Sequence, residues 1–242
     1  MLPAPNFLYL TELIGLEVYD LKKRRIGAVR DAAIFPLIDH VRIDRFLVGA
    51  GQTWLNVRYD QVRDITLEGI HLQDELLTPY HSDEDMLRMV RDLLDQQIID
   101  AHGRKVVRVN DVELYLNPSD SRTVLDVLSV DVGARGAVRR LAKGLVPSFT
   151  LRSLLEKIPP RVIPWQYVDL IETDPARRVK LKIAYEGLSK MHPADIADIV
   201  EDLPPAEQKA VFETLDEEVA AEALEEMDPE VQVAIVESLD KK

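Results

Sequence analysis

Apolar residues recur at a fixed spacing near the end of the chain. The positions are Met191, Leu203, Leu215, Met227 and Leu239. Their interval of twelve residues matches no single helix or strand period, so it belongs to a repeated unit rather than to one continuous element. Pro193, Pro205 and Pro229 each follow such a position by two residues, and proline is well tolerated at the first position of a helix. Each unit is therefore predicted to be a short helix followed by a tight corner.

The apolar positions within a unit predict how these helices pack. Ile196, Ile199 and Val200 share one helical face with Leu203. A helix of about two and a half turns is too short to be stable alone. Successive helices must then bury their apolar faces against one another, which predicts an α-solenoid.

A second, weaker repeat lies in the front of the chain. A segment beginning at Leu13 aligns without a gap with a segment beginning at Leu93, and we call this displacement the first offset. The aligned aspartates are Asp20 with Asp100 and Asp31 with Asp111. In both copies an apolar stretch ends in aspartate, passes through a basic turn and resumes as a β-branched stretch. This pattern is typical of a β-hairpin.

The similarity continues at a larger displacement, the second offset. Residues 54–65 resemble residues 161–171, with Tyr59 aligned to Trp165, so the second copy contains about 26 additional residues between its halves. Two strand-rich units follow, and their short strands and turns predict two small antiparallel β-barrels.

The stretch between the two strand-rich units predicts a linking helix. Ser82 can cap this helix, with Asp85 at the reciprocal position. Its apolar stripe would be Met86, Val90, Leu93 and Leu94. The expected fold is thus α+β and multidomain, with two barrels followed by an all-α solenoid. The expected domains are residues 1–80, 81–174 and 175–242.

The charge of the chain is concentrated in the tail. From Glu186 onward there are 17 Asp and Glu against 4 Lys, whereas the preceding residues hold 26 acids and 26 bases. Such a chain is a poor nucleic-acid ligand, because backbone binding needs a net basic face. The sequence has no cysteine, no secretory leader and no apolar run long enough for a membrane span, so a cytoplasmic location is expected.

Two resemblances to known families cover nearly the whole chain. The tail, in "MHPADIADIVEDLPPAEQKAVFETLDEEVAAEALEEMDPE", resembles the cytosolic N-terminal domain of MgtE-type magnesium transporters. The front, in "LIGLEVYD", "RIGAVRDA" and "RVIPWQYVDLI", resembles PRC-barrel domains, which also occur in ribosome-maturation factors and in a photosynthetic reaction-centre subunit. Together they imply PRC-type barrels joined to an MgtE-type acidic helical domain.

The transporter resemblance implies a ligand and a partner. In that family the acidic domain precedes a CBS-domain pair and a pore, and Mg²⁺ neutralises carboxylates where it meets the CBS domains. Aligning "AAEALEEM" places Glu222 at such a carboxylate, and its usual aspartate partner would follow Lys242. The resemblance therefore implies weakly held Mg²⁺ and a CBS-type domain or another protein as partner. Because the chain ends where another repeat would begin, we expect the solenoid to be truncated at its C-terminus.

The densest acidic group of the tail extends this candidate metal site. Its members are Asp216, Glu217, Glu222, Glu225, Glu226 and Asp228. Two carboxylates about 6 Å apart in water repel by roughly 0.7 kcal/mol, so cations relieve a crowded acidic surface. Mg²⁺ is commonly held through one or two carboxylates, so half a site would bind weakly until a partner completed it. The alternative is that these residues form an ordinary solvated helix face.

Basic residues at helical spacing form a second candidate surface in "ARGAVRRLAKG". They are Arg135, Arg139, Arg140 and Lys143. We interpret them as a dock for the acidic solenoid or for an acidic partner, with solvated surface as the alternative. Aromatic residues do not interleave with these charges, which disfavours base stacking with RNA.

The sequence contains no recognisable catalytic pattern. The five histidines are dispersed without metal-ligand spacing, and no P-loop, dinucleotide fingerprint or nucleophile elbow occurs. We therefore predict a non-enzymatic regulatory or sensor module linked to Mg²⁺ homeostasis or transport. The alternative is a protein-binding adaptor of the ribosome-maturation type that uses its barrels, and homodimerisation is left open.

Overall fold

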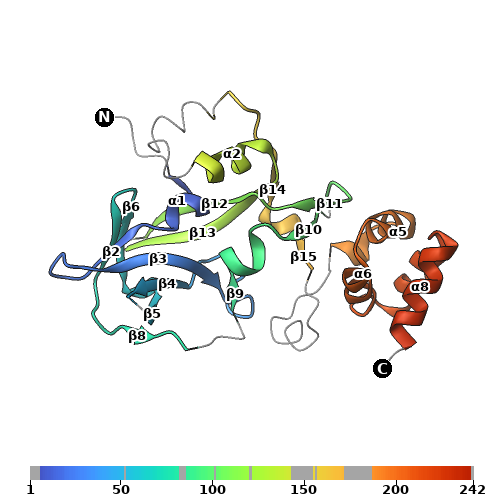
Figure 1. Cartoon of the computed structure of the whole chain (residues 1–242), viewed down its shortest axis with the longest axis horizontal. Coiled ribbons are helices and arrows are strands. Elements are labelled where there is room, and N and C mark those ends of the chain that lie inside the picture. Colours follow the sequence, from blue (N-terminus) through green and yellow to red (C-terminus); the bar gives the residue numbers. More distant parts are fainter. Residues whose placement is uncertain are drawn as a thin grey trace. The chain divides into compact units, whose positions relative to one another are not determined.

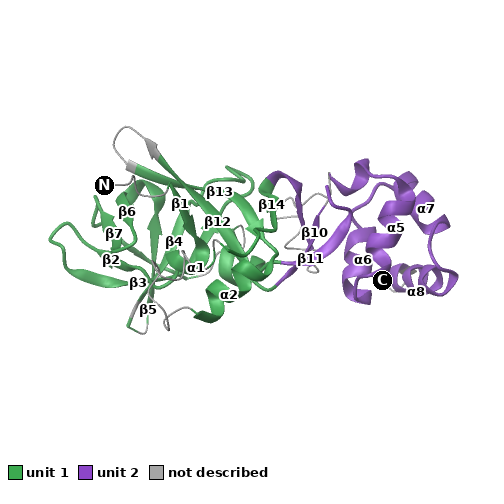
Figure 2. Cartoon of the chain, turned by 90° about the horizontal axis from the view of Figure 1, so that it is seen from above, with its two compact units in different colours: residues 1–95, 109–165 green, residues 96–108, 166–242 purple. Residues whose placement is uncertain are grey.

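The computed structural model describes residues 6–51, 53–81, 86–100, 102–119, 122–142, 155, 157–171 and 187–240. The chain forms two compact units, coloured green and purple in Figure 2. The first comprises residues 1–95 and 109–165, and the second comprises residues 96–108 and 166–242. The second strand-rich repeat is therefore divided between the units. The domain boundaries expected from the sequence stay a prediction.

The larger sheet of the first unit is built mainly from the first strand-rich repeat. Its order is β6-β7-β2-β3-β4-β5-β8, with β9 paired to β3. Neighbouring strands are antiparallel except β2 and β7. The strands are β2 (Glu17–Tyr19), β3 (Arg25–Ile34), β4 (Arg45–Ala50), β5 (Thr53–Arg58), β6 (Val62–Thr66), β7 (Gly69–Leu72), β8 (Thr78–Pro79) and β9 (Leu87–Arg88). Val29, Phe46 and Val57 on the three central strands are buried, as expected for a sheet with one face in the core.

A second sheet of the first unit combines both repeats. Its order is β1-β12-β13-β14, and every pair is antiparallel. The strands are β1 (Phe7–Tyr9), β12 (Asp111–Ser119), β13 (Arg122–Asp131) and β14 (Val162–Pro164). Two helices accompany this sheet, α1 (Leu10–Leu13) and α2 (Ala134–Ala142). Figure 1 shows α1 beside β12, and β1 pairs with β12, although these segments are far apart in the chain.

Both predicted hairpins are confirmed, and their aspartates explain the shared pattern. β2 pairs with β3, and β10 (Gln97–Asp100) pairs with β11 (Lys105–Arg108), each antiparallel. In the first turn, Asp20 Oδ1 accepts a hydrogen bond from the Lys22 N–H at 2.8 Å. In the second, Asp100 Oδ1 accepts one from the Gly103 N–H at 2.8 Å. The aspartate is therefore the residue that closes each turn.

The second offset is also confirmed. β5 is followed by the 3₁₀ turn η1 (Tyr59–Gln61) and then by β6. β14 is followed by the turn η3 (Trp165–Tyr167) and then by β15 (Val168–Leu170). The two turns begin at the aligned residues Tyr59 and Trp165 and join strands in the same order, so the front of the chain is an internal duplication.

The strands lie in open sheets, which corrects the prediction of two barrels. In the first repeat β7 lies between β6 and β2, and β8 adds a further strand to β5. In the second repeat the counterpart of β3 is split into β11 and β12, which belong to different sheets. A barrel requires one continuous ladder around its circumference, and neither repeat provides it.

Among the described residues, the predicted linking helix is shorter than expected and begins only after a two-residue strand. Leu87 and Arg88 form β9, and the helical part of this stretch is one π-helical turn, η2 (Met89–Leu93). The expected cap residues Ser82 and Asp85 lie outside the described residues. Local apolar spacing favoured a helix, but the free edge of β3 pairs with Leu87 and Arg88 instead.

The helical repeat of the tail is confirmed. The helices are α5 (Pro193–Glu201), α6 (Pro205–Phe212), α7 (Glu217–Glu225) and α8 (Pro229–Asp240), preceded by the turn η4 (Leu188–Lys190). Their first residues lie twelve positions apart, and all five periodic apolar residues belong to or pack against one buried cluster. Within the described ranges, no helix is long and apolar enough to span a membrane.

A small sheet formed by β10, β11 and β15 accompanies the helices of the second unit. Its strands precede the predicted all-α tail, whose described part, residues 187–240, contains helices and turns and no strand. The order of this sheet is β11-β10-β15, and both pairs are antiparallel. Ile99 of β10 is buried in the same cluster as the helices, and Val106 and Ile171 pack against that cluster. At the hairpin turn, Arg104 forms an ion pair of 2.7 Å with Asp195 of α5. The helical stack is thus covered at its first helix by strands from the duplicated region.

Candidate functional site

The six acidic residues predicted as metal ligands are exposed but divided along α7. Asp216 and Glu217 lie at the start of the helix, and Glu225 and Glu226 lie at its end. A helix of nine residues spans about 14 Å, so no single cation contacts both groups. Asp228 follows in the corner before α8.

Glu222, Glu225 and Glu226 form a continuous acidic face at the end of α7. Residues three and four positions apart are neighbours on a helix surface, and like charges there are destabilising. The C-terminal end of a helix also carries a partial negative charge, which disfavours further anions. Within the described part of the chain, none of these three glutamates forms an ion pair. A cation placed here would relieve repulsion from both sources.

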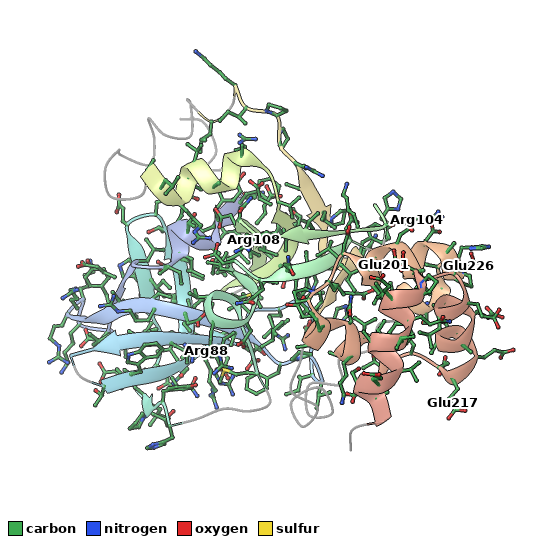
Figure 3. All side chains as sticks on the ribbon, turned by 45° about the vertical axis from the view of Figure 1, so that its right-hand side comes forward. Arg88, Arg104, Arg108, Glu201, Glu217 and Glu226 are labelled. Carbon is green, nitrogen blue, oxygen red and sulfur yellow. The ribbon has the colours of Figure 1, made fainter. Side chains whose placement is uncertain are left out.

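Glu201 joins this group from the end of α5. Its Oε1 atom accepts a hydrogen bond of 2.6 Å from the Asp228 N–H. Figure 3 shows Glu201 and Glu226 at one edge of the helical tail, whereas Glu217 lies at another. We refer to Glu201, Glu225, Glu226 and Asp228 as the acidic corner. Glutamate recurs every twelve residues at Glu201, Glu213, Glu225 and Glu237. This recurrence is a sequence signal for Glu201, but only the fold places it beside the corner before α8.

The acidic corner is not a complete metal site by itself. Among the described residues, no group of three or more His, Asp or Glu side chains is arranged to hold a metal ion. The Mg²⁺ assignment therefore stays a prediction, in the form of carboxylates that require further ligands from water or from a partner.

Two basic groups of the second unit, Arg104 and Lys209, are engaged away from the acidic corner. Arg104 pairs with Asp195 at 2.7 Å. The Lys209 ammonium donates to the Ser238 carbonyl at 2.6 Å and lies 3.8 Å from Glu213. Arg104 joins the β10–β11 turn to α5, and Lys209 joins α6 to α8. These cations therefore stabilise the fold and do not neutralise the acidic corner.

Two hydrogen bonds show that the structural repeat of the tail is a pair of helices. The Gln208 side chain donates to the Val200 carbonyl at 3.2 Å, and Gln232 donates to the Leu224 carbonyl at 3.1 Å. These contacts lie two twelve-residue units apart, so α7 and α8 correspond to α5 and α6. α5 packs on α7, and α6 packs on α8.

This equivalence identifies an uncovered surface on the second helix pair. Phe212 of α6 is 4% exposed, whereas its counterpart Val236 is 45% exposed. Ala197 of α5 is buried, whereas its counterpart Ala221 is exposed. We name Ala221, Val233 and Val236 the end face. In the first half of the stack, Ala197 and Phe212, the counterparts of Ala221 and Val236, are covered by packed helices.

The basic helix α2 does not present the predicted surface at Arg139. This side chain is 4% exposed, and its Nη1 atom lies 2.6 Å from Asp111 Oδ2 and 3.9 Å from Asp131 Oδ2. Its guanidinium carbon lies 3.3 Å from the centre of the Tyr9 ring. Burial raises the pKa of Asp111 and Asp131, although Arg139 acts in the opposite direction. Arg139 is therefore an internal counterion, which corrects its assignment to a docking surface.

The other predicted basic residues differ in their surroundings. Arg140 forms a two-bond ion pair with Asp95, with both distances 2.6 Å. Arg135 is partly buried, and Lys143 lies outside the described residues. A docking role for these residues stays a prediction, and the described contacts of Arg140 are within its own unit.

One family comparison matches the tail. Residues 191–242 match the family model described as the MgtE intracellular N domain. The match spans the helices α5–α8 and all six predicted metal ligands. No curated protein matches the chain. About a fifth of the chain, its acidic helical tail, is thus similar to the intracellular N domain of MgtE.

Proposed function

We propose that this protein is a non-enzymatic intracellular regulatory module of Mg²⁺ homeostasis or transport, whose acidic helical tail docks a partner domain in a Mg²⁺-dependent manner. The observation that carries the proposal is the match to the MgtE intracellular N domain over the four helices that bear the acidic corner. The partner is a CBS-type domain, as the resemblance implies.

The surface of the tail supports docking at the second helix pair. Ala221 and Val236 of the end face are exposed, whereas their counterparts Ala197 and Phe212 are buried, so a partner there would extend an existing packing interface. Glu222 is adjacent in sequence to Ala221 of the end face, and Glu225 and Glu226 lie one turn further. Apolar contact and carboxylate neutralisation would therefore occur on the same helix.

Magnesium fits this role because of its coordination chemistry. Mg²⁺ retains several waters and accepts one or two protein carboxylates. A carboxylate on each side of an interface would share one hydrated ion, and neither side alone would bind it strongly. A ligand at ten times its dissociation constant stabilises the bound form by about 1.4 kcal/mol, so several such ions are needed for a sharp response.

The first test measures Mg²⁺ binding by the full chain. Backbone amide resonances of α7 are followed by NMR during a Mg²⁺ titration to about 20 mM, with Na⁺ at equal ionic strength as the reference. We expect saturable shifts centred on Glu222, Glu225 and Glu226, with millimolar dissociation constants. The double variant Glu222→Gln/Glu226→Gln is expected to weaken binding at least five-fold.

A matched variant controls for net charge. Glu230→Gln/Glu237→Gln removes the same charge from exposed positions of α8 and is expected to leave the α7 shifts within two-fold of wild type. Shifts that are linear in Mg²⁺, or that Na⁺ reproduces, would show general screening and contradict the proposal.

The second test addresses the partner. A purified CBS-domain pair from an MgtE-type transporter is the probe, and its binding to the chain is measured by calorimetry with and without Mg²⁺. We expect binding in Mg²⁺ that falls at least ten-fold in Na⁺ and in Val236→Asp. Equal affinity with both salts would reject Mg²⁺ dependence, and binding by Val236→Asp equal to wild type would reject the end face as the docking surface.

A further inference from the structure

Two short segments of the first unit are copies of one structural motif. The first arm, residues 7–13, consists of β1 and α1, and the second arm, residues 87–93, consists of β9 and η2. Two residues after each arm lies a residue with positive φ, 93° at Gly15 and 65° at Asp95. The N–H of Gly15 donates to the Val29 carbonyl at 2.8 Å, and that of Asp95 donates to the Val109 carbonyl at 2.9 Å. All these pairs are related by the first offset of the internal duplication.

Each arm is seated on the opposite repeat. Leu8 of the first arm pairs with Leu114 of β12, whereas Leu87 of the second arm pairs with Ile34 of β3. Ile34 and Leu114 are equivalent at the first offset. Their partners Leu87 and Leu8 differ from it by one residue, so the two arms pair with registers that differ by one position. Figure 1 shows α1 of the first arm beside β12 and β9 of the second arm near β3. The leading segment of each repeat thus pairs with the other repeat within one chain.

An equivalent buried aspartate receives each arm. Asp111 Oδ1 accepts a hydrogen bond from the Thr11 N–H at 3.1 Å, and Asp111 Oδ2 accepts one from the Thr11 hydroxyl at 2.7 Å. Asp31 Oδ1 accepts one from the Val90 N–H at 2.8 Å. Both carboxylates are at most 1% exposed. Each therefore satisfies an N–H in the short helical turn of an arm, a role usually filled by a capping side chain from the same helix.

Apolar burial and strand pairing complete the two acceptor surfaces. The arm side chains Leu8, Leu10, Leu13, Leu87, Met89 and Leu93 are all at most 2% exposed. Backbone pairing with a sheet edge supplies affinity, and alternate side chains in pockets supply specificity, as in other cases of strand addition. The aspartate fixes the register, because it accepts from one residue of the turn.

We propose that the acceptor surface on β12 is an interaction site for a second copy of this chain, which supplies its first arm to form an arm-exchanged dimer. Every contact of such a dimer already exists within the single chain, so only the hinge at Gly15 and the protein concentration decide between the two forms. The reciprocal exchange inside the chain shows that two repeats joined in this way form a closed pair.

The absence of cysteine from the sequence allows a specific test. Phe7 and Tyr115 are directly opposed on β1 and β12, with ring centroids 5.6 Å apart. One chain carries Phe7→Cys and another carries Tyr115→Cys. The two are mixed, unfolded in urea, refolded together at high concentration and oxidised. An interchain disulfide between positions 7 and 115 is expected on a non-reducing gel, because one copy's arm then lies on the other copy's β12.

The hinge variant Gly15→Val strengthens the test. A φ of 93° at Gly15 is readily adopted by glycine but strained for valine, so the substitution disfavours the closed hinge and not an extended one. Gly15→Val is added to both the Phe7→Cys chain and the Tyr115→Cys chain. We expect it to increase the fraction of dimer, measured by light scattering, at least five-fold.

The control pair combines Phe7→Cys with Arg63→Cys, an exposed residue of β6. Folded chains that give no more disulfide between positions 7 and 115 than this control would overturn the proposal. If Gly15→Val prevents folding, the comparison with the unaltered hinge decides alone.

Discussion

Arg139 and Arg140 are adjacent on α2 and have opposite surroundings. Arg139 is buried against Asp111, whereas the pair of Arg140 with Asp95 is solvent-exposed. Loss of one partner of a buried ion pair costs about 3–5 kcal/mol, but an exposed pair contributes about 0–1 kcal/mol. We therefore expect Arg139→Met to destabilise the first unit by about 3–5 kcal/mol and Arg140→Met by less than about 1 kcal/mol.

Tryptophan fluorescence during urea unfolding measures this difference, because both tryptophans, Trp54 and Trp165, belong to the first unit. Adding Asp111→Asn to Arg139→Met is expected to restore part of the loss, since it removes the unpaired buried charge. Equal destabilisation by the two single substitutions would contradict the role of Arg139 as an internal counterion.

The sequence did not predict which side chains of α2 point into the core and which point to solvent. The spacing of basic residues in α2 predicted a helix, and the helix is present. The partners of Arg139 are Asp111 and Asp131 on two strands, and no local pattern connects them. The exposure of the six acidic residues was predictable, because they alternate with buried apolar positions of a short amphipathic helix.

At the scale of elements, prediction succeeded where the cause was local. Apolar anchors every twelve residues, with prolines at three of the four helix starts, determine the tail helices, and the aspartates determine the hairpin turns. The linking helix is shorter than predicted because Leu87 and Arg88 pair with β3, and Asp31 accepts a hydrogen bond from the Val90 N–H. These contacts depend on residues far away in the chain, which a local pattern does not contain.

The helix-pair repeat allows the same position to be compared in two environments. Phe212 is buried, whereas its counterpart Val236 is 45% exposed on the end face. We expect Phe212→Ala to destabilise the second unit by about 3–5 kcal/mol, because it leaves a cavity, and Val236→Ala by less than about 0.5 kcal/mol. Both substitutions introduce alanine, so loss of helix propensity does not account for a difference.

Far-UV circular dichroism during urea unfolding measures the two changes. If Val236→Ala costs as much as Phe212→Ala, the end face is packed in solution, for example against another chain. That result would remove the uncovered surface on which the docking proposal depends.

For the whole molecule, the duplication was predictable but its assembly was not. The two offsets, defined by Leu13 with Leu93 and by Tyr59 with Trp165, located equivalent strands correctly, whereas closure into barrels depended on sheet edges that meet other elements. The exchange of arms and the division of the second repeat between two units both arise from contacts between distant segments. Sequence similarity between the repeats carries no information about which copy each segment contacts.

The balance of buried and exposed acids predicts how stability of the first unit depends on pH. Burial raises the pKa of Asp31 and Asp131 above the ordinary value of 3.8. A carboxyl group whose pKa is higher in the folded than in the unfolded state contributes to folding stability. This contribution is fully present below the unfolded-state pKa and is lost as pH rises through the folded-state pKa. Stability is therefore expected to increase as pH falls from 7 towards 4.

Below that range, other carboxyl groups reverse the trend. Hydrogen bonding to the Arg24 backbone N–H lowers the pKa of Asp20. Burial opposes such a shift at Asp64, but hydrogen bonds from Arg63 and His71 outweigh it and lower the pKa of that carboxyl as well. Groups whose pKa is lower in the folded state contribute to folding stability above the unfolded-state pKa. Their contribution is lost as pH falls through the folded-state pKa. Stability of the first unit should therefore pass through a maximum near pH 4 and decline under stronger acid.

Urea unfolding followed by tryptophan fluorescence at pH 7.5, 5.5, 4 and 2.5 measures this profile. Asp131→Asn keeps an oxygen that can accept from the Gly133 N–H, which now donates to Asp131 at 2.8 Å, but it removes the titrating charge. We expect this variant to be more stable than wild type at pH 7.5 and to show a smaller gain on acidification to pH 4. A wild-type chain that loses stability steadily from pH 7.5 to 4 would show that the buried carboxylates are fully compensated by Arg88 and Arg139, and that the charge network inside the first unit is balanced at neutral pH.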